Sequence, residues 1–300
     1  MRKHRQTAHP DRGAAIRRET IRDATRWLHK AALLAAMLLI PLSLLAEPRL
    51  ALEGPLEQGG VVFGETTPGA TVRLAGREVR VSPQGRFVLG FGRDAESPQH
   101  LVVKGPGGDT LERELEIAAR DYDIQRIDGV PPETVTPPPD ALERIRAEIR
   151  LVRKARQRDD ARTDFTADFI WPVTGRISGV YGSQRVYNGE PRRPHYGIDI
   201  AAPAGRTVRA PAPGIVTVAD SDMYYSGGTI LLDHGHGLSS AFLHLQSVAV
   251  KKGERVEQGQ PIGAVGAGGR ATGPHLDWRV NWFDRRVDAA HLVGPMPEDN

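Results

Sequence analysis

The sequence contains no cysteine. This absence excludes a disulfide framework and a thiol nucleophile, and it leaves histidine, aspartate and glutamate as the ligands of any metal site. Evenly spread positive charge is also absent, although the formal net charge is +3. Residues 1–30 hold nine Lys/Arg against three Asp/Glu, which leaves 31 basic and 34 acidic residues from Glu47 onward. The main part of the chain is therefore slightly acidic, and we expect no nucleic-acid partner.

Residues 31–46 contain no charged side chain and follow the basic segment. Sixteen uncharged, mostly apolar residues are long for a signal-peptide core and short for a membrane span. The positive charge before them predicts that everything after them is exported. Cleavage after Ala46 is plausible, although Leu44 at the third position before the cut suits an A-x-A-like site poorly. We predict a signal peptide at residues 1–46, with an uncleaved signal anchor as the alternative.

Between residues 47 and 118 short β-runs alternate with turn signals. His100 stands alone there, so the segment is interpreted as a positioning or binding module. About seven short strands in this length predict a small β-sandwich, Ig-like in outline. The clearest candidate strands are residues 61–63, 71–74, 79–81, 87–89, 101–103 and 115–117.

Residues 119–167 read as a connector. Residues 119–139 end in proline clusters and predict an extended spacer. Asp140 and Glu143 have the spacing of a capping box, which predicts a helix that starts at Asp140. Docking of its apolar stripe on a neighbouring domain is favoured over a coiled coil, and the charges that continue to Arg162 are interpreted as a solvated face. The stripe consists of Leu142, Ile145, Ile149 and Val152.

Residues 168–300 show almost no helical periodicity, which predicts an antiparallel β-domain. Its clearest candidate strands are residues 214–219, 228–233, 240–244 and 261–265.

A histidine and a carboxylate lie four positions apart at His195 and Asp199. On a helix such residues share a face, whereas on a straight strand they lie ~13 Å apart, too far to share an ion. The surrounding residues are β-like, so the backbone must bend between the two side chains, and Gly197 permits a bend. By spacing alone, a metal site and a solvated pair on a loop both remain open.

Two further segments carry histidine. On a strand, His275 and Asp277 point to the same face about 6.6 Å apart, so one can bind a metal while the other faces a substrate. His244 lies in an apolar strand, where an imidazole needs a polar partner.

Taken in order, these motifs resemble peptidase family M23 (lysostaphin/LytM type), zinc metallopeptidases that cut peptide cross-links in bacterial peptidoglycan. The resemblance covers about residues 168–293. It implies a mainly β chain in which an antiparallel M23 catalytic domain follows the small Ig-like β-sandwich and a short helical linker. The whole chain is similar to a Gram-negative, exported member, so we expect it in the periplasm or held at the inner membrane. Segments 178–182, 197–203, 233–237 and 250–256 also fall in family order.

The resemblance implies that His195 and Asp199 are two ligands of one zinc ion, that His244 and His275 are catalytic, and that position 277 is the third ligand. This chain departs from the family there, because Asp277 replaces a histidine. A carboxylate ligates zinc at ~2.0–2.2 Å, much as an imidazole does, so a site of one histidine and two aspartates remains feasible. Its added negative charge is expected to make zinc a weaker Lewis acid. Phe242 is a second departure, since the family often has tyrosine there.

The predicted function is therefore hydrolysis of peptidoglycan cross-links, of the D,D type by preference, with peptidoglycan and cell-envelope proteins as partners. The first alternative is an inactive M23 domain that binds peptidoglycan or activates a cell-wall amidase. The second is a biotinyl/lipoyl-type carrier at residues 250–266, which is disfavoured because residues 257–259 supply no lysine at the hairpin tip. His234 and His236 are interpreted as structural turn residues near the groove rim, and His291 as incidental.

Overall fold

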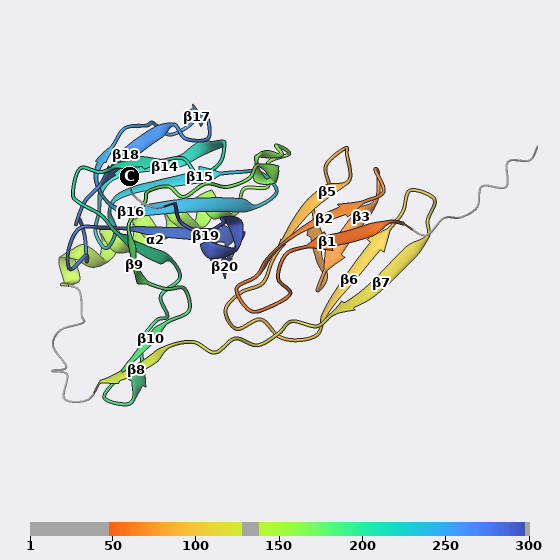
Figure 1. Cartoon of the computed structure of the whole chain (residues 1–300), viewed down its shortest axis with the longest axis horizontal. Coiled ribbons are helices and arrows are strands. Elements are labelled where there is room, and N and C mark those ends of the chain that lie inside the picture. The colour runs from red at the N-terminus through yellow and green to blue at the C-terminus, as the bar shows by residue number, and fades with distance from the viewer. Residues whose placement is uncertain (1–47, 128–137, 298–300) are drawn as a thin grey trace, which may run out of the picture. The chain divides into compact units, whose positions relative to one another are not determined.

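The computed structural model describes residues 48–127 and 138–297 (Figure 1). The predicted signal peptide or anchor at residues 1–46 lies outside the described residues, as do residues 128–137 of the predicted spacer. Among the residues that are described, no helix is long and apolar enough to cross a membrane.

The first part of the chain forms two antiparallel sheets with the strand orders β1-β2-β5 and β4-β3-β6-β7. Buried side chains from both sheets, such as Phe87 and Leu101, form its core. The strand predicted at residues 115–117 is wrong: the chain turns back at Gly105–Asp109, so residues 110–115 pair with β6 instead. The strands are β1 (Leu50–Glu53), β2 (Val61–Thr66), β3 (Thr71–Leu74), β4 (Arg77–Val79), β5 (Arg86–Gly90), β6 (Gln99–Lys104) and β7 (Thr110–Leu115).

Part of the predicted spacer is a strand. β8 (Ile124–Ile127) pairs in parallel with β10 (Gln184–Tyr187), which also pairs with β11 (Glu190–Pro191). An extended segment has backbone N–H and C=O groups that need hydrogen-bond partners, and those on one edge of β8 pair with β10. The spacer is thus anchored next to the segment that leads to His195.

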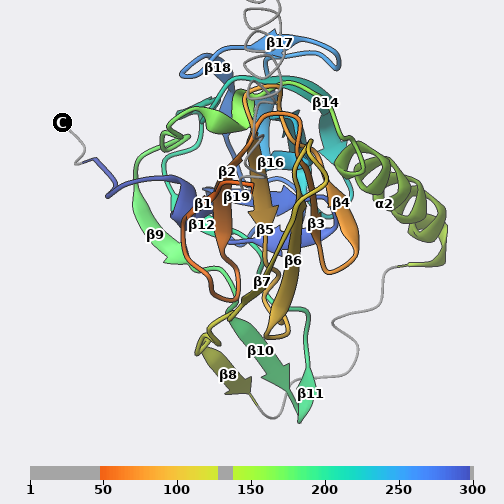
Figure 2. The ribbon, with the colours of Figure 1, turned by 90° about the vertical axis from the view of Figure 1, so that its right-hand side faces the viewer.

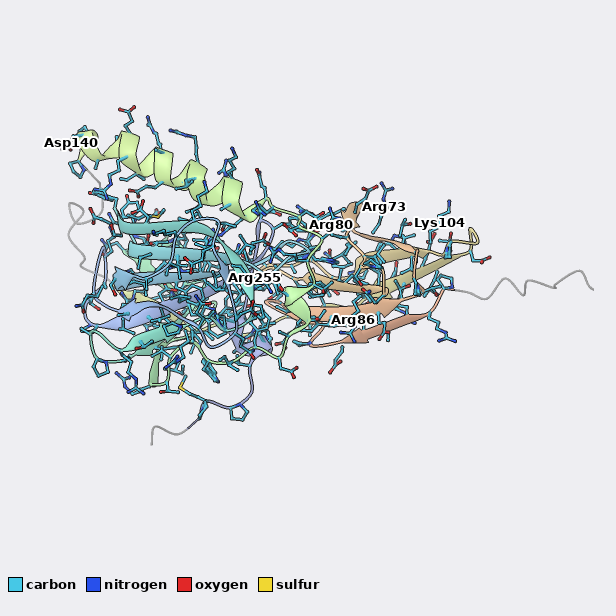
Figure 3. All side chains as sticks on the ribbon, turned by 90° about the horizontal axis from the view of Figure 1, so that it is seen from above. Arg73, Arg80, Arg86, Lys104, Asp140 and Arg255 are labelled. Carbon is cyan, nitrogen blue, oxygen red and sulfur yellow. The ribbon has the colours of Figure 1, made fainter. Side chains whose placement is uncertain are left out.

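The helix begins differently from the capping-box prediction. A 3-10 turn (η2, Pro139–Ala141) leads into α2 (Leu142–Arg156), and the cap of α2 makes no side-chain hydrogen bond. Asp140, exposed at the start of this segment in Figure 3, already lies inside helical backbone. It cannot cap the helix, because a capping residue needs extended backbone outside the helix. The 3-10 turn already begins at Pro139, whose ring fixes φ at a helical value, so Asp140 is the second residue of the turn and does not precede it.

The predicted docking of the helix is confirmed. Ile145 is buried, and Val152 packs with Ala155 on a small apolar cluster of β14–β16 that includes Met223 and Leu243. Figure 2 shows α2 alongside β14. Ile149 is half exposed and faces the cleft described below. The helix is thereby part of the second half of the chain.

The second half is built on one large sheet with the order β17-β14-β15-β16-β19-β12-β9, and its paired strands are antiparallel (Figure 1). β13 and β18 continue it beside β16, and β20 beside β19. Short 3-10 turns η3 (Asp164–Thr166) and η4 (Ala289–Leu292) flank it. The strands are β9 (Arg176–Gly179), β12 (Ile198–Ala201), β13 (Thr207–Arg209), β14 (Gly214–Met223), β15 (Gly227–Asp233), β16 (Leu238–Val248), β17 (Arg255–Val256), β18 (Pro261–Val265), β19 (His275–Trp282) and β20 (Arg285–Val287).

The charges after the helix are not simply a solvated face, as had been expected. The guanidinium groups of Arg158 and Arg162 each lie 2.9 Å from the buried carboxylate of Asp233, at the end of β15. A buried carboxylate needs such partners, since the loss of its hydration is costly. These ion pairs tie the connector to the sheet that carries the predicted site.

Candidate functional site

The side chains of strand β19 point alternately into the hydrophobic core and into a cleft. Leu276, Trp278, Val280 and Trp282 point into the core and have no exposed surface. The residues between them line a cleft with a volume of about 1740 Å³, and they are His275, Asp277, Arg279 and Asn281. Side chains of a strand alternate between its faces, so β19 presents four polar groups in one row.

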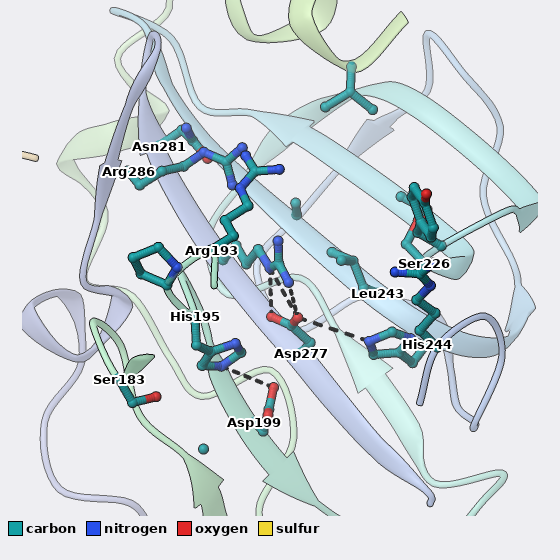
Figure 4. Close-up of a pocket in the computed structure, with 18 of the residues that line it drawn as sticks. Ser183, Arg193, His195, Asp199, Ser226, Leu243, His244, Asp277, Asn281 and Arg286 are labelled. Carbon is teal, nitrogen blue, oxygen red and sulfur yellow. Dashed lines mark hydrogen bonds and ion pairs between the residues drawn. The ribbon is translucent and has the colours of Figure 1, made fainter. Parts of the chain in front are cut away.

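His195, Asp199 and Asp277 meet in this cleft (Figure 4). One potential ligand atom from each residue lies within 4.8 Å of the others. β12 begins only at Ile198, so His195 precedes the strand and the expected bend lies between the two residues. The spacing that was ambiguous in the sequence therefore produces a cluster of metal-ligating groups.

Two buried atoms of the cluster face each other without a hydrogen bond. His195 Nε2 and Asp199 Oδ1 have no hydrogen bond among the described residues, and they lie 3.2 Å apart. Two ligands held ~2.05 Å from a tetrahedral zinc ion are about 3.3 Å apart. Buried polar atoms normally find partners, so this pair fits a cation at the site.

Asp277 has a different environment. It lies directly opposite Asp199 across the β12–β19 pair, and like charges in that position are destabilising. Arg279 binds both Asp277 oxygens, with Nε 2.9 Å from Oδ1 and 3.0 Å from Oδ2. Burial alone would raise the pKa of Asp277, but the guanidinium and its hydrogen bonds hold the pKa below its usual value, so the carboxylate is ionised.

Glycines allow the carboxylates to lie this close to the backbone. A Cβ at Gly197 would lie 2.2 Å from Asp277 Oδ1 and 2.9 Å from the Trp278 carbonyl oxygen. A Cβ at Gly179 would lie 2.4 Å from Asp199 Oδ2. Position 197 therefore has no room for a side chain, because Asp277 and the Trp278 carbonyl lie against its backbone. This reason for glycine adds to the bend that the sequence suggested.

His244 and His275 lie side by side, with ring centroids 4.9 Å apart. The Nδ1 atoms lie 2.8 Å from the carbonyl oxygens of Gly268 and Gly273 respectively. A carbonyl can only accept a hydrogen bond, so both Nδ1 atoms carry protons, and the neutral form of each ring has its lone pair on Nε2. His244 Nε2 is 4.0 Å from Asp277 Oδ2, and His275 Nε2 is 3.8 Å from Asp199 Oδ1.

His244 is held in a strained conformation with a φ of +64°. The backbone there breaks from regular pairing, and the His244 N–H donates to the Ser226 carbonyl, 2.7 Å away. Strained backbone in a non-glycine residue is often kept at functional sites. Burial lowers the pKa of His244, so the ring is neutral near pH 7.

The other histidines lie elsewhere. His234 and His236 are buried structural residues of the β15–β16 turn, and neither lines the cleft, so their predicted place near its rim is wrong. Their rings hydrogen bond to carbonyl oxygens of Pro213 and Arg80, which explains their burial. His291 lies in η4, 3.2 Å from Glu57 of the β-sandwich.

The sequence interpretation overlooked Arg279 and Asn281. Their signal was present, because residues that alternate with the apolar Trp278, Val280 and Trp282 must share the face of Asp277. Arg156 and Arg286 also line the cleft, but they come from α2 and β20, and no local pattern brings them together.

The geometry thus brings together three side chains able to hold one metal ion and two neighbouring imidazoles, set on an antiparallel sheet. The profile of peptidase family M23 matches residues 193–289. A Pseudomonas aeruginosa structure described as a peptidase M23 is 31% identical, with a TM-score of 0.63, over 79% of this chain and 95% of the other. The chain belongs to peptidase family M23, and the carrier-module alternative is thereby set aside.

Two curated relatives have named activities. The peptidoglycan DD-endopeptidase ShyA of Vibrio cholerae is 36% identical over 122 residues, which are 40% of this chain and 28% of ShyA. The DD-carboxypeptidase/endopeptidase Mpg of Neisseria meningitidis is 35% identical over 126 residues, 42% of this chain and 29% of Mpg. This chain therefore spans less than a third of the length of either relative.

Proposed function

We propose that this chain is a zinc-dependent endopeptidase that hydrolyses peptide cross-links of peptidoglycan, with His195, Asp199 and Asp277 as ligands of one zinc ion. The observation that carries the proposal is the buried pair of His195 Nε2 and Asp199 Oδ1, which lie 3.2 Å apart without a hydrogen bond, beside the ionised Asp277. When bound, zinc supplies a Lewis acid for the scissile carbonyl and lowers the pKa of a water molecule.

His244 and His275 are the proton-transfer groups in this proposal. Their Nδ1–H groups are bound to backbone carbonyls, which fixes the rings and turns Nε2 toward the cluster. Either Nε2 can accept the proton of the attacking water. The resulting imidazolium can stabilise the oxyanion and then give its proton to the leaving amine. Because burial lowers the pKa of His244, this ring is neutral at neutral pH, as a base must be.

Arg279 offsets the effect that the charge of Asp277 is expected to have on the Lewis acidity of a bound zinc ion. The replacement of a histidine ligand by aspartate adds one negative charge, whereas the bidentate Arg279 adds one positive charge in direct contact. The pair together is close to the neutral imidazole in net charge. The expected weakening of the Lewis acid is thereby reduced.

Peptidoglycan as the substrate is supported by the names of both relatives, and the D,D bond is the one named for them. Both relatives come from Gram-negative bacteria, in which this polymer lies in the periplasm. The predicted export signal at residues 1–46 agrees with that location.

A muropeptide digest tests the proposal. The purified full chain, loaded with zinc, is incubated with sacculi, and soluble products are identified by mass spectrometry. We expect cross-linked dimers to disappear, and loss of activity by at least ~100-fold in His244→Ala, since a positioned acid–base group contributes that much. His100→Ala, which removes an exposed imidazole of the β-sandwich, is the matched control and should keep full activity.

An inactive M23 domain that binds peptidoglycan or activates an amidase is the second candidate. It is favoured by one observation, namely that Arg279 already occupies both oxygens of Asp277. Sacculus binding without product release, by a chain that carries one zinc per molecule, would establish this candidate and reject the endopeptidase.

A further inference from the structure

Four arginines line one part of the cleft next to His195, Asp199 and Asp277. Arg156 comes from the last turn of α2, Arg193 from the loop before His195, Arg279 from β19 and Arg286 from β20. In Figure 4, Arg286 and Asn281 lie on the side of Asp277 away from His244. Arg279 is committed to Asp277.

The other three lack an anionic partner. Among the described residues, no carboxylate makes an ion pair with Arg156, Arg193 or Arg286. The guanidinium groups of Arg193 and Arg286 lie over the face of Tyr196, at 5.7 Å and 5.3 Å from the ring centroid. Arg286 Nη1 is buried and makes no hydrogen bond.

Two acidic residues that line the same cleft are paired with other groups. Glu148 accepts hydrogen bonds from Arg144 and from the Tyr224 backbone N–H. Asp284 pairs with Arg77 at 2.7 Å. Neither of these two carboxylates therefore forms an ion pair with Arg156, Arg193 or Arg286.

These charges act on one another. Burial, followed by the charges of Arg279 and Arg193, lowers the pKa of Arg286 to about 10. Burial likewise lowers the pKa of Arg156, and the charges of Arg286, Arg279 and Arg193 lower it further. A pKa of about 10 still leaves Arg286 protonated at neutral pH. The folded chain therefore keeps repelling cations together, which is unfavourable unless an anion binds between them.

We infer that Arg156, Arg193 and Arg286 form a subsite that binds a carboxylate of the peptide substrate beside the scissile bond. Guanidinium groups bind carboxylates through paired, charge-assisted hydrogen bonds, and they do so best where water is partly excluded. Stem peptides of peptidoglycan carry free carboxylates, both within the peptide and at its end. This inference rests on the proposed function for the identity of the substrate.

The subsite gives α2 a part in substrate binding. Arg156 is supplied by the helix that precedes the sheet, and it reaches the cleft because Val152 and Ala155 pack on β14–β16. Arg156 lies outside residues 193–289, the part of the chain that the M23 family profile matches. The helix is thus a component of the binding site as well as a connector.

Isothermal titration tests the subsite. The zinc-treated full chain with His244→Ala, which prevents consumption of the ligand, is titrated with a stem tetrapeptide at constant ionic strength. Three peptides are compared: the free acid, a form with its internal carboxylates converted to carboxamides, and a form with only its terminal carboxylate converted. We expect one amidation to weaken binding by about tenfold or more, as for a lost hydrogen bond to a charged group.

The same loss should follow from Arg156→Gln, and it should not add to the effect of that amidation. Lys154→Gln, which removes an exposed positive charge on the same helical turn outside the cleft, is the matched control and should bind normally. Since Arg156 lies among repelling cations, Arg156→Gln should leave the thermal midpoint unchanged or raise it.

Each outcome bears on one claim. A preference for the free acid that disappears in Arg156→Gln supports the subsite, and the sensitive amide shows which carboxylate it holds. Equal affinity for all three peptides, or equal weakening of all three by Arg156→Gln, overturns it. Because binding is measured without cleavage, a wild-type chain that prefers the free acid but releases no product would reject the endopeptidase and retain the subsite.

Discussion

Asp277 and Arg279 behave as one unit, two residues apart on the same face of β19. Asp277 is buried, and Arg279 satisfies its charge through a bidentate contact. A buried charge that loses its partner is strongly destabilising, even where the intact pair contributes little. The carboxylate at position 277 therefore depends on the arginine at position 279 for its charge partner.

Restoring the family residue should consequently damage the fold. We expect Asp277→His to lower the free energy of unfolding of the metal-free chain by up to about 3 kcal/mol, because the partly buried Arg279 is left without its carboxylate. Asp277→His combined with Arg279→Gln should recover most of this loss. Urea unfolding of both variants measures the difference.

Arg279→Gln alone completes the cycle and should also destabilise the chain, since Asp277 then lacks its cation. Equal stability of Asp277→His with and without Arg279→Gln would show that the two residues are not coupled.

The turn between β15 and β16 is an element stabilised by buried histidine. His234 Nδ1 donates to the Pro213 carbonyl at 2.7 Å, and Nε2 lies 2.9 Å from the Ser240 hydroxyl, which can donate to it. Burial lowers the pKa of His234 below its usual value, although the bond to Pro213 opposes this. The native state therefore holds a neutral ring in a pH range where the unfolded chain binds a proton.

Linkage then gives the sign of the pH effect. With a folded pKa below the ordinary value of ~6.5, the stabilisation is complete above pH ~6.5 and is lost as the pH falls toward the folded pKa. We expect His234→Gln to reduce this dependence by up to about 1.4 kcal/mol per pH unit in that window. Unfolding of the metal-free chain in urea at pH values from 7.5 to 5 measures it.

Ser240→Ala is the control, because it removes a partner of the ring but keeps the titrating group. It should lower stability by a similar amount at every pH. A slope that is the same in the wild type and in His234→Gln would contradict the assignment.

The β-sandwich and the large sheet share one hydrophobic core. Buried residues of both belong to a single cluster of contacts, and Phe63 stacks on Phe165 with centroids 6.4 Å apart. At Gly90 a Cβ would lie 2.5 Å from Trp282 Cβ and 3.0 Å from Val287 Cγ1, and the Gly90 carbonyl accepts a hydrogen bond from Arg285. The two halves should therefore unfold together.

Gly90→Val tests this cooperativity. The added methyl groups overpack the contact with Trp282, so we expect a loss of about 1–3 kcal/mol. Tryptophan fluorescence reports on the large sheet through Trp278 and Trp282, while hydrogen exchange reports on β2 and β5. The free energy of unfolding obtained from fluorescence and that obtained from hydrogen exchange should fall by the same amount.

Gly92→Ala serves as the control, since its Cβ would meet no atom within 4 Å. Faster exchange in β2 and β5 with an unchanged fluorescence transition would mean that the halves unfold independently.

Much of this molecule follows from local patterns. Alternation and turn signals predict most strands, such as β2, β5 and β18, because each strand buries one or both faces whatever its partners are. The motif order in the sequence also singled out His195, Asp199, His244, His275 and Asp277, which the structure brings into one cleft. Motifs of this kind are local in sequence, so they can be read without knowledge of the fold.

The remaining features depend on contacts between distant segments. The carboxylate pair of Asp199 and Asp277 arises from the register of β12 against β19, which no single strand encodes. The meeting of Arg156, Arg193 and Arg286 needs a docked helix, a loop and a strand at once. Charge and exposure are properties of a three-dimensional neighbourhood, which is why Arg158 and Arg162 appeared solvated in the sequence but bind the buried Asp233 in the folded chain.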